Sequence, residues 1–389
     1  MKKVPRLRFR GFQEDWELCK LGELIESFDS ERIPIDSSLR ISGQYPYYGA
    51  TGIIDYIDSY IFDGEYVLLA EDGANIIMRN YPVAYLTQGK FWLNNHAHIM
   101  RMVKGDNQFL VQILEKMNYS KYNTGTAQPK LNSNIVKRIN LRVPIPEEQQ
   151  KIGTLFKQLD DTITLHQRKL DQLKELKTAY LQVIFPVKDE RVPKLRFADF
   201  EEEWELCKLG DLANIVGGGT PNTNNPKCWD GNIDWYAPAE IKEKIYVTGS
   251  KKRITELGLQ KSSAKVLPIG TVLFTSRAGI GNTAILAKKG TTNQGFQSII
   301  PNKNKLDTYF IFSRTHELKK YGEAVGAGST FVEVSGKQMA KMPMLTPRFN
   351  EQQAIGMFFK KIDDIITLHQ NKLEQLKDLK TSYLQNMFI

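Results

Sequence analysis

The sequence is poor in cysteine, the residue that forms the disulfides of small secreted proteins and binds structural zinc. Only three of its 389 residues are cysteines, and no two of them form a CxxC pair. An odd number of widely separated cysteines provides no disulfide framework. The composition, 41% hydrophobic and 25% charged, is that of a globular protein and excludes a disordered or fibrous chain.

Long apolar runs and a strong charge excess are missing as well. No run approaches the roughly 18 apolar residues that a membrane span needs, and the basic segment 1–10 leads into no apolar signal region. We therefore expect a cytoplasmic protein that does not cross a membrane. The 53 basic residues exceed the 44 acidic ones to give a net charge of +9. This favours a polyanionic partner only weakly, because the charge is spread over a chain with room for two or three domains.

Phosphate-binding loops are also absent. The glycine-rich segments 217–222 (GGGTPN) and 326–331 (GAGSTF) lack the lysine of the GxxxxGK[ST] pattern that contacts nucleotide phosphates. The sequence therefore predicts no cofactor for this chain.

The most informative feature that is present is a double internal repeat. Residues 4–24 align without gaps on residues 192–212, with 15 of 21 positions identical, and residues 148–185 align on residues 351–388, with 26 of 38 identical. The blocks between these segments, 25–143 and 213–346, show no comparable identity. The chain therefore runs twice through a constant segment, a variable block and a second constant segment.

The second constant segment predicts a long helix. Its apolar residues recur at alternating steps of four and three, which is the a/d seam of a coiled coil. Neither helix can bury this stripe alone, so we expect the two copies to pair. The pair should be antiparallel, because the second variable block joins the end of the first helix to the start of the second. The seam residues are Ile152, Phe156, Leu159, Ile163, His166, Leu170, Leu173 and Tyr180 in the first copy and Ile355, Phe359, Ile362, Ile366, His369, Leu373, Leu376 and Tyr383 in the second.

Polar residues on and beside the seam leave alternatives open. His166 and His369 should face each other, either as ordinary core histidines or as a polar layer that fixes the helix register. The acidic pairs 160–161 and 363–364 lie beside the seam and predict a solvated face or a face that docks a partner.

The variable blocks are rich in short β-prone runs bounded by Gly, Asn and Asp, such as 66–70, 90–93, 271–274 and 283–287, and each block ends in a more helical stretch, 107–117 and 306–321. The fold class predicted is α/β, with two mixed α/β domains separated by a long antiparallel two-helix coiled coil in a pseudo-twofold internal repeat. The predicted limits are 1–143 for the first domain, 144–190 for the first helix and linker, 191–346 for the second domain and 347–389 for the second helix.

The ordered set of local phrases resembles one family. WELCKLGEL (16–24), YPYYGATGIIDYI (45–57) and NNHAHIMR (94–101) in the first half, with LFTSRAGIGNTAI (273–285), TNQGF (292–296) and NEQQAIGMFF (350–359) in the second, are together similar to the specificity subunit of type I restriction-modification enzymes. The resemblance covers essentially the whole chain.

The resemblance implies a non-catalytic DNA-binding subunit. Each of two target recognition domains would read one half of a bipartite, interrupted sequence in double-stranded DNA. The helical pair would act as a ruler and dock the modification subunits. The implied partners are methyltransferase subunits, two by expectation, and restriction subunits with translocase and nuclease activity.

The chain lacks the chemistry of those partners. The NPP-aromatic motif expected of an adenine methyltransferase is absent, since residues 224–227 read NNPK. Asp234 with Glu240 and Lys242 could present two carboxylates and an amine to a metal, although such spacing recurs by chance. We expect no catalytic residue and no metal site; the alternative is a fused restriction-modification protein with intrinsic Mg²⁺-dependent nuclease activity.

His96 and His98 could also ligate a metal, but no Cys/His pair nearby completes a tetrahedral set. On a strand both rings would lie on the same face, either pointing outward at DNA or packing inward, and packing on the strand is the favoured interpretation.

Candidates for DNA contact are polar side chains near open turns, because Arg pairs with guanine edges and Asn or Gln with adenine edges. Each is also compatible with an ordinary surface residue. In the first block they are Arg79, Gln88, Lys90, Asn94, Asn95, Gln128 and Lys130. In the second block they are Ser276, Arg277, Asn282, Thr292, Asn293, Gln294 and Thr330.

Overall fold

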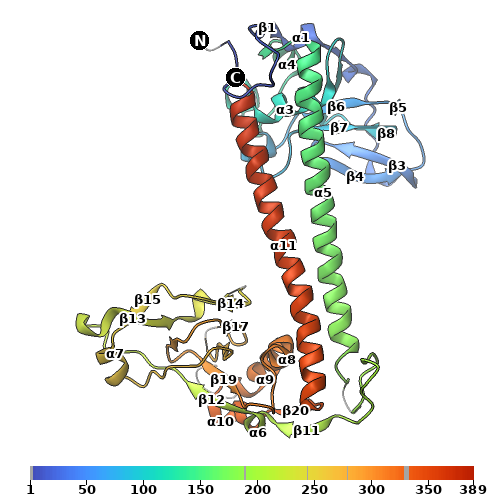
Figure 1. Ribbon diagram of the computed structural model, residues 1–389. Coiled ribbons are helices and arrows are strands. Elements are labelled where there is room, and N and C mark those ends of the chain that lie inside the picture. The colour runs from blue at the N-terminus through green and yellow to red at the C-terminus, as the bar shows by residue number, and fades with distance from the viewer. Residues whose placement is uncertain (1–2, 188–189, 243, 278, 328–332) are drawn as a thin grey trace. The chain divides into compact units, whose positions relative to one another are not determined.

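The computed structural model describes residues 3–187, 190–242, 244–277, 279–327 and 333–389. The chain forms two compact units (Figure 1): unit 1 is Met1–Lys169 with His369–Ile389, and unit 2 is Leu170–Leu368. The two long helices, α5 (Pro146–Val183) and α11 (Phe349–Met387), confirm the predicted helices. Each helix is divided between the two units, so neither unit is one continuous stretch of the chain. In the described part of the chain, no helix has the length and apolarity needed to cross a bilayer.

Unit 1 holds a two-stranded ribbon, β1-β10, and two four-stranded sheets, β2-β9-β6-β7 and β4-β3-β8-β5. The strands are β1 (Glu17–Lys20), β2 (Ile25–Ser27), β3 (Ser42–Gly49), β4 (Gly52–Ile57), β5 (Phe62–Asp63), β6 (Tyr66–Ala70), β7 (Ala84–Thr87), β8 (Lys90–Leu93), β9 (Ala97–Met102) and β10 (Asn140–Val143). The helices are α1 (Leu21–Leu24), α2 (Asn75–Met78), α3 (Asn107–Lys116) and α4 (Ser133–Lys137), with 3-10 turns η1 (Asp29–Glu31), η2 (Ser37–Leu39) and η3 (Ser120–Tyr122).

Strand β6 lies at the centre of unit 1 and is buried along its whole length. Successive side chains of a strand face opposite sides of the sheet. Accordingly, Val67 packs in the cluster that contains Phe109 of α3, while Leu68 packs in a second cluster with Phe62 and Phe91. Burial on both faces explains why this strand reads as a continuous apolar run rather than as an alternating one.

Unit 2 holds a ribbon, β11-β20, a five-stranded sheet, β12-β19-β16-β17-β14, and a three-stranded sheet, β15-β13-β18. The strands are β11 (Glu205–Lys208), β12 (Ala213–Gly217), β13 (Trp229–Tyr236), β14 (Tyr246–Val247), β15 (Lys252–Ile254), β16 (Val272–Phe274), β17 (Thr283–Leu286), β18 (Thr291–Thr292), β19 (Gln297–Pro301) and β20 (Pro343–Thr346). The helices are α6 (Leu209–Leu212), α7 (Glu256–Gln260), α8 (Thr308–Ser313), α9 (Thr315–Gly326) and α10 (Gly336–Ala340), with η4 (Pro226–Cys228) and η5 (Pro238–Glu240).

The two units share one topology although their variable blocks show no comparable identity. The order β2-β9-β6-β7 recurs as β12-β19-β16-β17, with β14 added at the edge in unit 2. The parallel pair β3·β8 places Tyr48 opposite Leu93, and its equivalent β13·β18 places Tyr236 opposite Thr292. The mixed α/β class predicted for each block is therefore confirmed, and the blocks are two versions of one domain.

One predicted helix is interrupted. The stretch 306–321 forms α8 and α9, which are separated at Arg314. Arg314 is buried, and its guanidinium donates to the Leu345 carbonyl and pairs with Glu317. On a continuous amphipathic helix the Arg314 side chain would lie in solvent. These contacts hold it in the core instead.

The constant segments dock on the helix ends in the same way in both units. In unit 1 the Leu7 amide donates to the Asn386 carbonyl of α11 at 2.9 Å, so the segment before β1 lies beside the C-terminal end of α11 (Figure 1). In unit 2 the Leu195 amide donates to the Val183 carbonyl of α5 at 2.9 Å. Each first constant segment therefore begins where the helix of the other copy ends.

The two helices pair antiparallel in each unit. In unit 1 the Nδ1 atoms of His166 and His369 lie 2.8 Å apart, and Lys380 Nζ lies 2.6 Å from Asp160 Oδ1. All sixteen predicted seam residues are buried or half-buried. In unit 2 the Lys177 ammonium lies 2.6 Å from Asp363, and the Tyr180 and Phe358 rings lie 4.9 Å apart, so residue numbers again fall along one helix as they rise along the other.

The solvated face predicted for the acidic pairs is wrong for Asp363, which is 3% exposed and accepts from Lys177 and from the Tyr309 hydroxyl. Its neighbour Asp364 is exposed, as predicted, and pairs with Lys360 one turn earlier at 2.8 Å. The inner carboxylate of the pair thus contributes to helix packing and only the outer one lies in solvent.

Candidate nucleic-acid interface

Three loop segments meet in unit 1 at what we call junction 1, made of residues 71–72, 94–96 and 130–131. The Glu71 amide donates to the His96 carbonyl at 2.9 Å, and the Leu131 amide donates to the Glu71 carbonyl at 2.7 Å. An isolated antiparallel bridge joins Asp72 to Lys130. The junction therefore has its backbone groups paired although no long strand runs through it.

Unit 2 builds the same arrangement, junction 2, from residues 276–277, 293–295 and 333–334. The Ser276 amide donates to the Gly295 carbonyl at 2.8 Å, and the Val334 amide donates to the Ser276 carbonyl at 3.0 Å. An isolated antiparallel bridge joins Arg277 to Glu333. Every one of these bonds has its counterpart in junction 1.

An asparagine turn fixes the middle segment in both junctions. Asn94 Oδ1 accepts from the His96 amide at 2.8 Å, and Asn293 Oδ1 accepts from the Gly295 amide at 2.8 Å. The amides of Asn94 and Asn293 donate to the carbonyls of Tyr48 and Tyr236, respectively. Asparagine suits this position because its short side chain can accept from the backbone two residues further on.

A buried charged network supports junction 1. His98 is 1% exposed; its Nδ1 lies 2.8 Å from Asp29 and its Nε2 lies 2.7 Å from the Leu131 carbonyl. Burial by itself would raise the pKa of Asp29, but the hydrogen bond and charge of His98, with the Ile99 amide, lower that pKa to about 2. Arg32 adds a 2.6 Å contact to Glu71. The loop that ends at Leu131 is thereby tied to the sheet.

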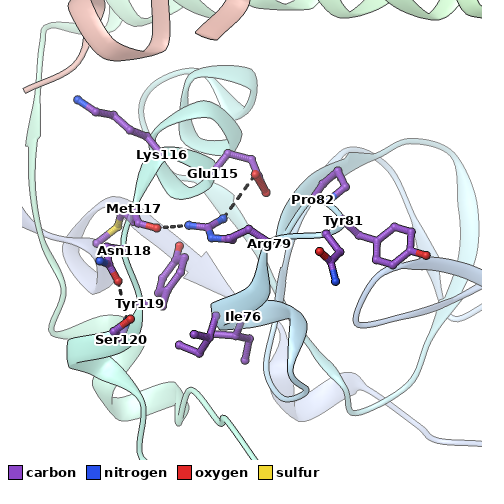
Figure 2. A pocket seen from close by; sticks show the side chains of 12 residues that line it. Ile76, Arg79, Tyr81, Pro82, Glu115, Lys116, Met117, Asn118, Tyr119 and Ser120 are labelled. Carbon is purple, nitrogen blue, oxygen red and sulfur yellow. Dashed lines mark hydrogen bonds and ion pairs between the residues drawn. The ribbon is translucent and has the colours of Figure 1, made fainter. Parts of the chain in front are cut away.

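Arg79 was a predicted DNA contact, but its side chain binds residues of its own domain (Figure 2). It caps α2 in the left-handed conformation, with φ 58°, and lines a cavity of about 570 Å³. Its guanidinium donates to the Met117 carbonyl, lies 3.5 Å from Glu115 and stacks 5.3 Å from the centre of the Tyr119 ring. These contacts hold the side chain against its own domain.

The other candidates of the first block fall into two places. Asn95, Gln128 and Lys130 are exposed and lie on or next to junction 1. Gln88 and Lys90 are exposed at the β7–β8 turn, where Gln88 donates to Glu65 and Lys90 lies over the Tyr60 ring.

Junction 2 gathers most candidates of the second block. Arg277 Nη2 donates to the Gln294 carbonyl at 2.8 Å and lies 3.2 Å from Glu333 Oε1. Asn293 lies on the same loop, and Asn282 is exposed nearby in sequence with its side-chain Nδ2 donating to the Gly279 carbonyl. Thr330 lies outside the described residues.

Three candidates are buried, which contradicts their expected place on exposed turns. Asn94, Ser276 and Thr292 are 5%, 0% and 1% exposed, respectively. Asn94 and Ser276 hydrogen-bond within the junctions and Thr292 lies in strand β18, so these side chains are not presented to a ligand. Sequence reasoning in turn missed the acidic residues Asp72 and Glu333, because only cationic, amide and hydroxyl side chains were sought. The signal available was the Asn-x-His and Asn-x-Gly pair that follows a strand in both blocks.

The two carboxylates of the nuclease-like pattern, Asp234 and Glu240, do not gather where they could bind one metal ion. The Asp234 carboxylate lies 3.2 Å from Lys288 and 3.4 Å from Arg253, while Glu240 accepts from the amides of Ala237 and Lys251. The two carboxylates thus face different partners. Among the described residues, no group of three or more His, Cys, Asp or Glu could hold a metal ion.

The two histidines of NNHAHIM do not share a face, contrary to the expectation. Strand β9 begins at Ala97, so His96 belongs to the preceding turn. His96 is half in solvent with its Nδ1 3.0 Å from Asp72, whereas His98 is buried. Neither is free to complete a shared metal site.

Comparisons with known proteins agree with this duplicated fold. A family model described as the type I restriction modification DNA specificity domain matches residues 13–175 and again 201–378. The type I restriction enzyme MjaIX specificity subunit of Methanocaldococcus jannaschii is 33% identical over 191 residues, 48% of this chain and 44% of that protein. The putative type I restriction enzyme specificity subunit S.HindORF215P of Haemophilus influenzae is 27% identical over 357 residues, 91% of this chain and 89% of that protein.

The match therefore spans less than half of the length of the first relative and about nine tenths of the second. The crystal structure of a type I restriction-modification system S subunit from M. genitalium has the same fold, with a TM-score of 0.73 at 13% identity and coverage of 99% of both chains. Since two copies of the family's domain cover most of the sequence, the chain belongs to the family of type I restriction-modification DNA specificity proteins.

Proposed function

We propose that the chain is the DNA-recognition subunit of a type I restriction-modification system and reads a bipartite, interrupted sequence, one half-site per unit. The observation that carries the proposal is the pair of junctions. The same backbone hydrogen bonds are formed in both units, while the exposed side chains differ. Two readers of unlike half-sites need a constant scaffold with different polar groups on it.

The exposed polar side chains at the junctions have the chemistry for base edges and phosphates. Gln128 and Lys130 at junction 1 and Arg277 and Gln294 at junction 2 supply amide and cationic donors in turns. Arginine and lysine neutralise phosphates and release counterions, so binding should weaken steeply with salt. The chain acts in the cytoplasm, where it meets the DNA of the cell.

Catalysis belongs to partner subunits in this proposal. An adenine methyltransferase modifies the DNA, and a restriction subunit translocates and cleaves it. The chain recognises the DNA sequence at which these subunits act. The contacts of Asp234 and Glu240 with cations and backbone amides support a structural rather than a nuclease role for these carboxylates.

The helices carry repeated apolar positions that fit two copies of one partner. Leu165 of α5 and Leu368 of α11 are equivalent in the repeat and both 66% exposed; Leu176 and Leu379 are a second equivalent, exposed pair. Exposed leucines at equivalent positions of both copies would offer the same apolar contact to two copies of one partner. We assign these positions to two methyltransferase subunits, one on each copy, and the paired helices to the ruler that sets the half-site spacing.

Mapping methylated adenines in DNA from cells that carry this chain with its methyltransferase partner tests the proposal. The expected motif is split, with two specified halves around a fixed number of unread positions. A continuous motif, or no methylation that depends on this chain, would contradict it. Binding of the purified assembly to a duplex carrying the motif should lose affinity linearly in log K against log salt.

A further inference from the structure

We propose that the residue pair at the isolated bridge of each junction sets which polarity of base edge that unit reads: a hydrogen-bond donor, Arg277, in unit 2 and an acceptor, Asp72, in unit 1. The inference deepens the proposed function and rests on it. It assigns one guanine contact to unit 2 and one contact with a base amino group, that of cytosine, to unit 1.

The bridges occupy the same place in the same hydrogen-bond pattern but carry opposite charges. In unit 1 the bridge runs from Asp72 to Lys130, acidic first and basic second along the chain. In unit 2 it runs from Arg277 to Glu333, basic first and acidic second. A role in folding alone does not require this reversal, because the backbone bonds around both bridges are equivalent.

Arg277 is held in a position from which it can read a base. Its Nη2 is anchored by the Gln294 carbonyl at 2.8 Å and by Glu333 at 3.2 Å, while the side chain remains 40% exposed. The guanidinium has five N–H groups in a rigid fork, and a bidentate contact with guanine O6 and N7 needs two. Anchoring before binding reduces the side-chain entropy that is lost when the contact forms.

Asp72 presents the opposite polarity. Both of its carboxylate oxygens lie 3.0 Å from His96 Nδ1, and its side chain is partly exposed. The Lys130 ammonium across the bridge turns to Glu71, at 3.4 Å, so it leaves the Asp72 carboxylate to its histidine and to solvent. An ionised carboxylate only accepts hydrogen bonds, and acidic side chains accept from the cytosine N4 amino group.

A charge-swapped variant tests the inference in the full chain with its methyltransferase partner. Arg277→Asp combined with Glu333→Lys keeps an ion pair at the bridge but gives junction 2 the charge order of junction 1. Methylation mapping and selection from randomised duplexes should show a changed base preference at one position of one half-site. The change should be between about 5-fold and 150-fold, since a bidentate contact contributes about 1–3 kcal/mol of discrimination. The other half-site should stay as in the parent.

Two single variants keep the test informative if the swap prevents assembly. Arg277→Gln should relax discrimination at that same position, and Asp72→Asn should relax one position of the opposite half-site. The matched control swaps an exposed pair that belongs to neither the junctions nor the two long helices, Arg191→Glu with Glu203→Arg, and should leave the motif unchanged.

The outcomes separate this inference from the function on which it rests. If the parent methylates a split motif but the swap and both single variants keep every preference, the bridge does not select bases and the inference is wrong. If the parent shows no split motif, the proposed function itself fails. A change in both half-sites from one variant would also overturn the assignment of one bridge to one half-site.

Discussion

Removing the charge of Glu148 should loosen unit 1 and leave unit 2 intact. The Glu148 carboxylate is fully buried and accepts Arg8 Nε–H at 2.7 Å on one oxygen and Nη2–H at 2.8 Å on the other. The pair joins the first constant segment to the start of α5. The hydrogen bond to Glu148 raises the pKa of the Arg8 guanidinium, which stays charged when the carboxylate is replaced.

The geometry sets the size of the effect. Glu148→Gln keeps one oxygen that can accept from Arg8 but removes the countercharge of a guanidinium whose side chain is only 13% exposed. Breaking a buried ion pair by removing one partner costs about 3–5 kcal/mol. Because Gln retains one acceptor, we expect the low end, about 3 kcal/mol. At about 1.4 kcal/mol per factor of ten, the open population of this contact rises on the order of 100-fold.

Hydrogen exchange measured by mass spectrometry on the full chain tests the magnitude. Amides of residues 4–24 should exchange on the order of 100-fold faster in Glu148→Gln, and those of residues 192–212 should not change. Glu351→Gln, which removes the equivalent partner of Arg196, should give the reverse pattern. Glu147→Gln, an exposed neighbour, is the control. Unchanged protection of residues 4–24, or equal loss in both segments, would refute the reasoning.

Three further outcomes are expected. Because the pKa of Asp29 is about 2 in the folded chain and about 3.9 when unfolded, its ionised form stabilises unit 1 above pH of about 4, and this contribution, on the order of 2 kcal/mol, is lost as the pH falls to about 2. Asp29→Asn should therefore flatten the acid side of the denaturation profile; an identical slope would count against it. Replacing His166 and His369 together by Leu should preserve the helix pair but broaden the half-site spacings found by methylation mapping, whereas one unchanged spacing would exclude a register role. Replacing Leu165 and Leu368 by Ser should leave the melting temperature within a few degrees and weaken co-purification of the methyltransferase partner, and undiminished co-purification would place the docking surface elsewhere.

The long helices were predictable because the information for them is local and repeated. A seam at steps of four and three can be recognised within a single segment, and its second copy identifies the helix with which the first one pairs. The contacts of Asp363 were not predictable in this way, since its partner Lys177 lies 186 positions away and becomes a neighbour only when the helices align.

The candidate site was predictable in composition but not in detail. Asn94 was identified as a polar turn residue, yet its side-chain oxygen accepts from the His96 amide. Its own backbone amide donates to the carbonyl of Tyr48, which lies on another strand. Exposure of a polar residue depends on such distant backbone partners, which no local pattern reveals. The equivalence of the two junctions could not be predicted from the sequence for the same reason. It consists of backbone hydrogen bonds, which form with different side chains at the same positions.

The residues that stabilise the fold differ in burial from the pair to which we assign base reading. The Arg8–Glu148 pair is buried and identical in kind to Arg196–Glu351, so a substitution at either costs several kcal/mol. The Arg277–Glu333 pair is 40% and 36% exposed, and a pair so solvated contributes about 0–1 kcal/mol to folding. Reversing or replacing it should therefore cost little stability, and under our proposal it would change what a base edge meets. The two copies of the domain can thus hold opposite charges at one position of one scaffold.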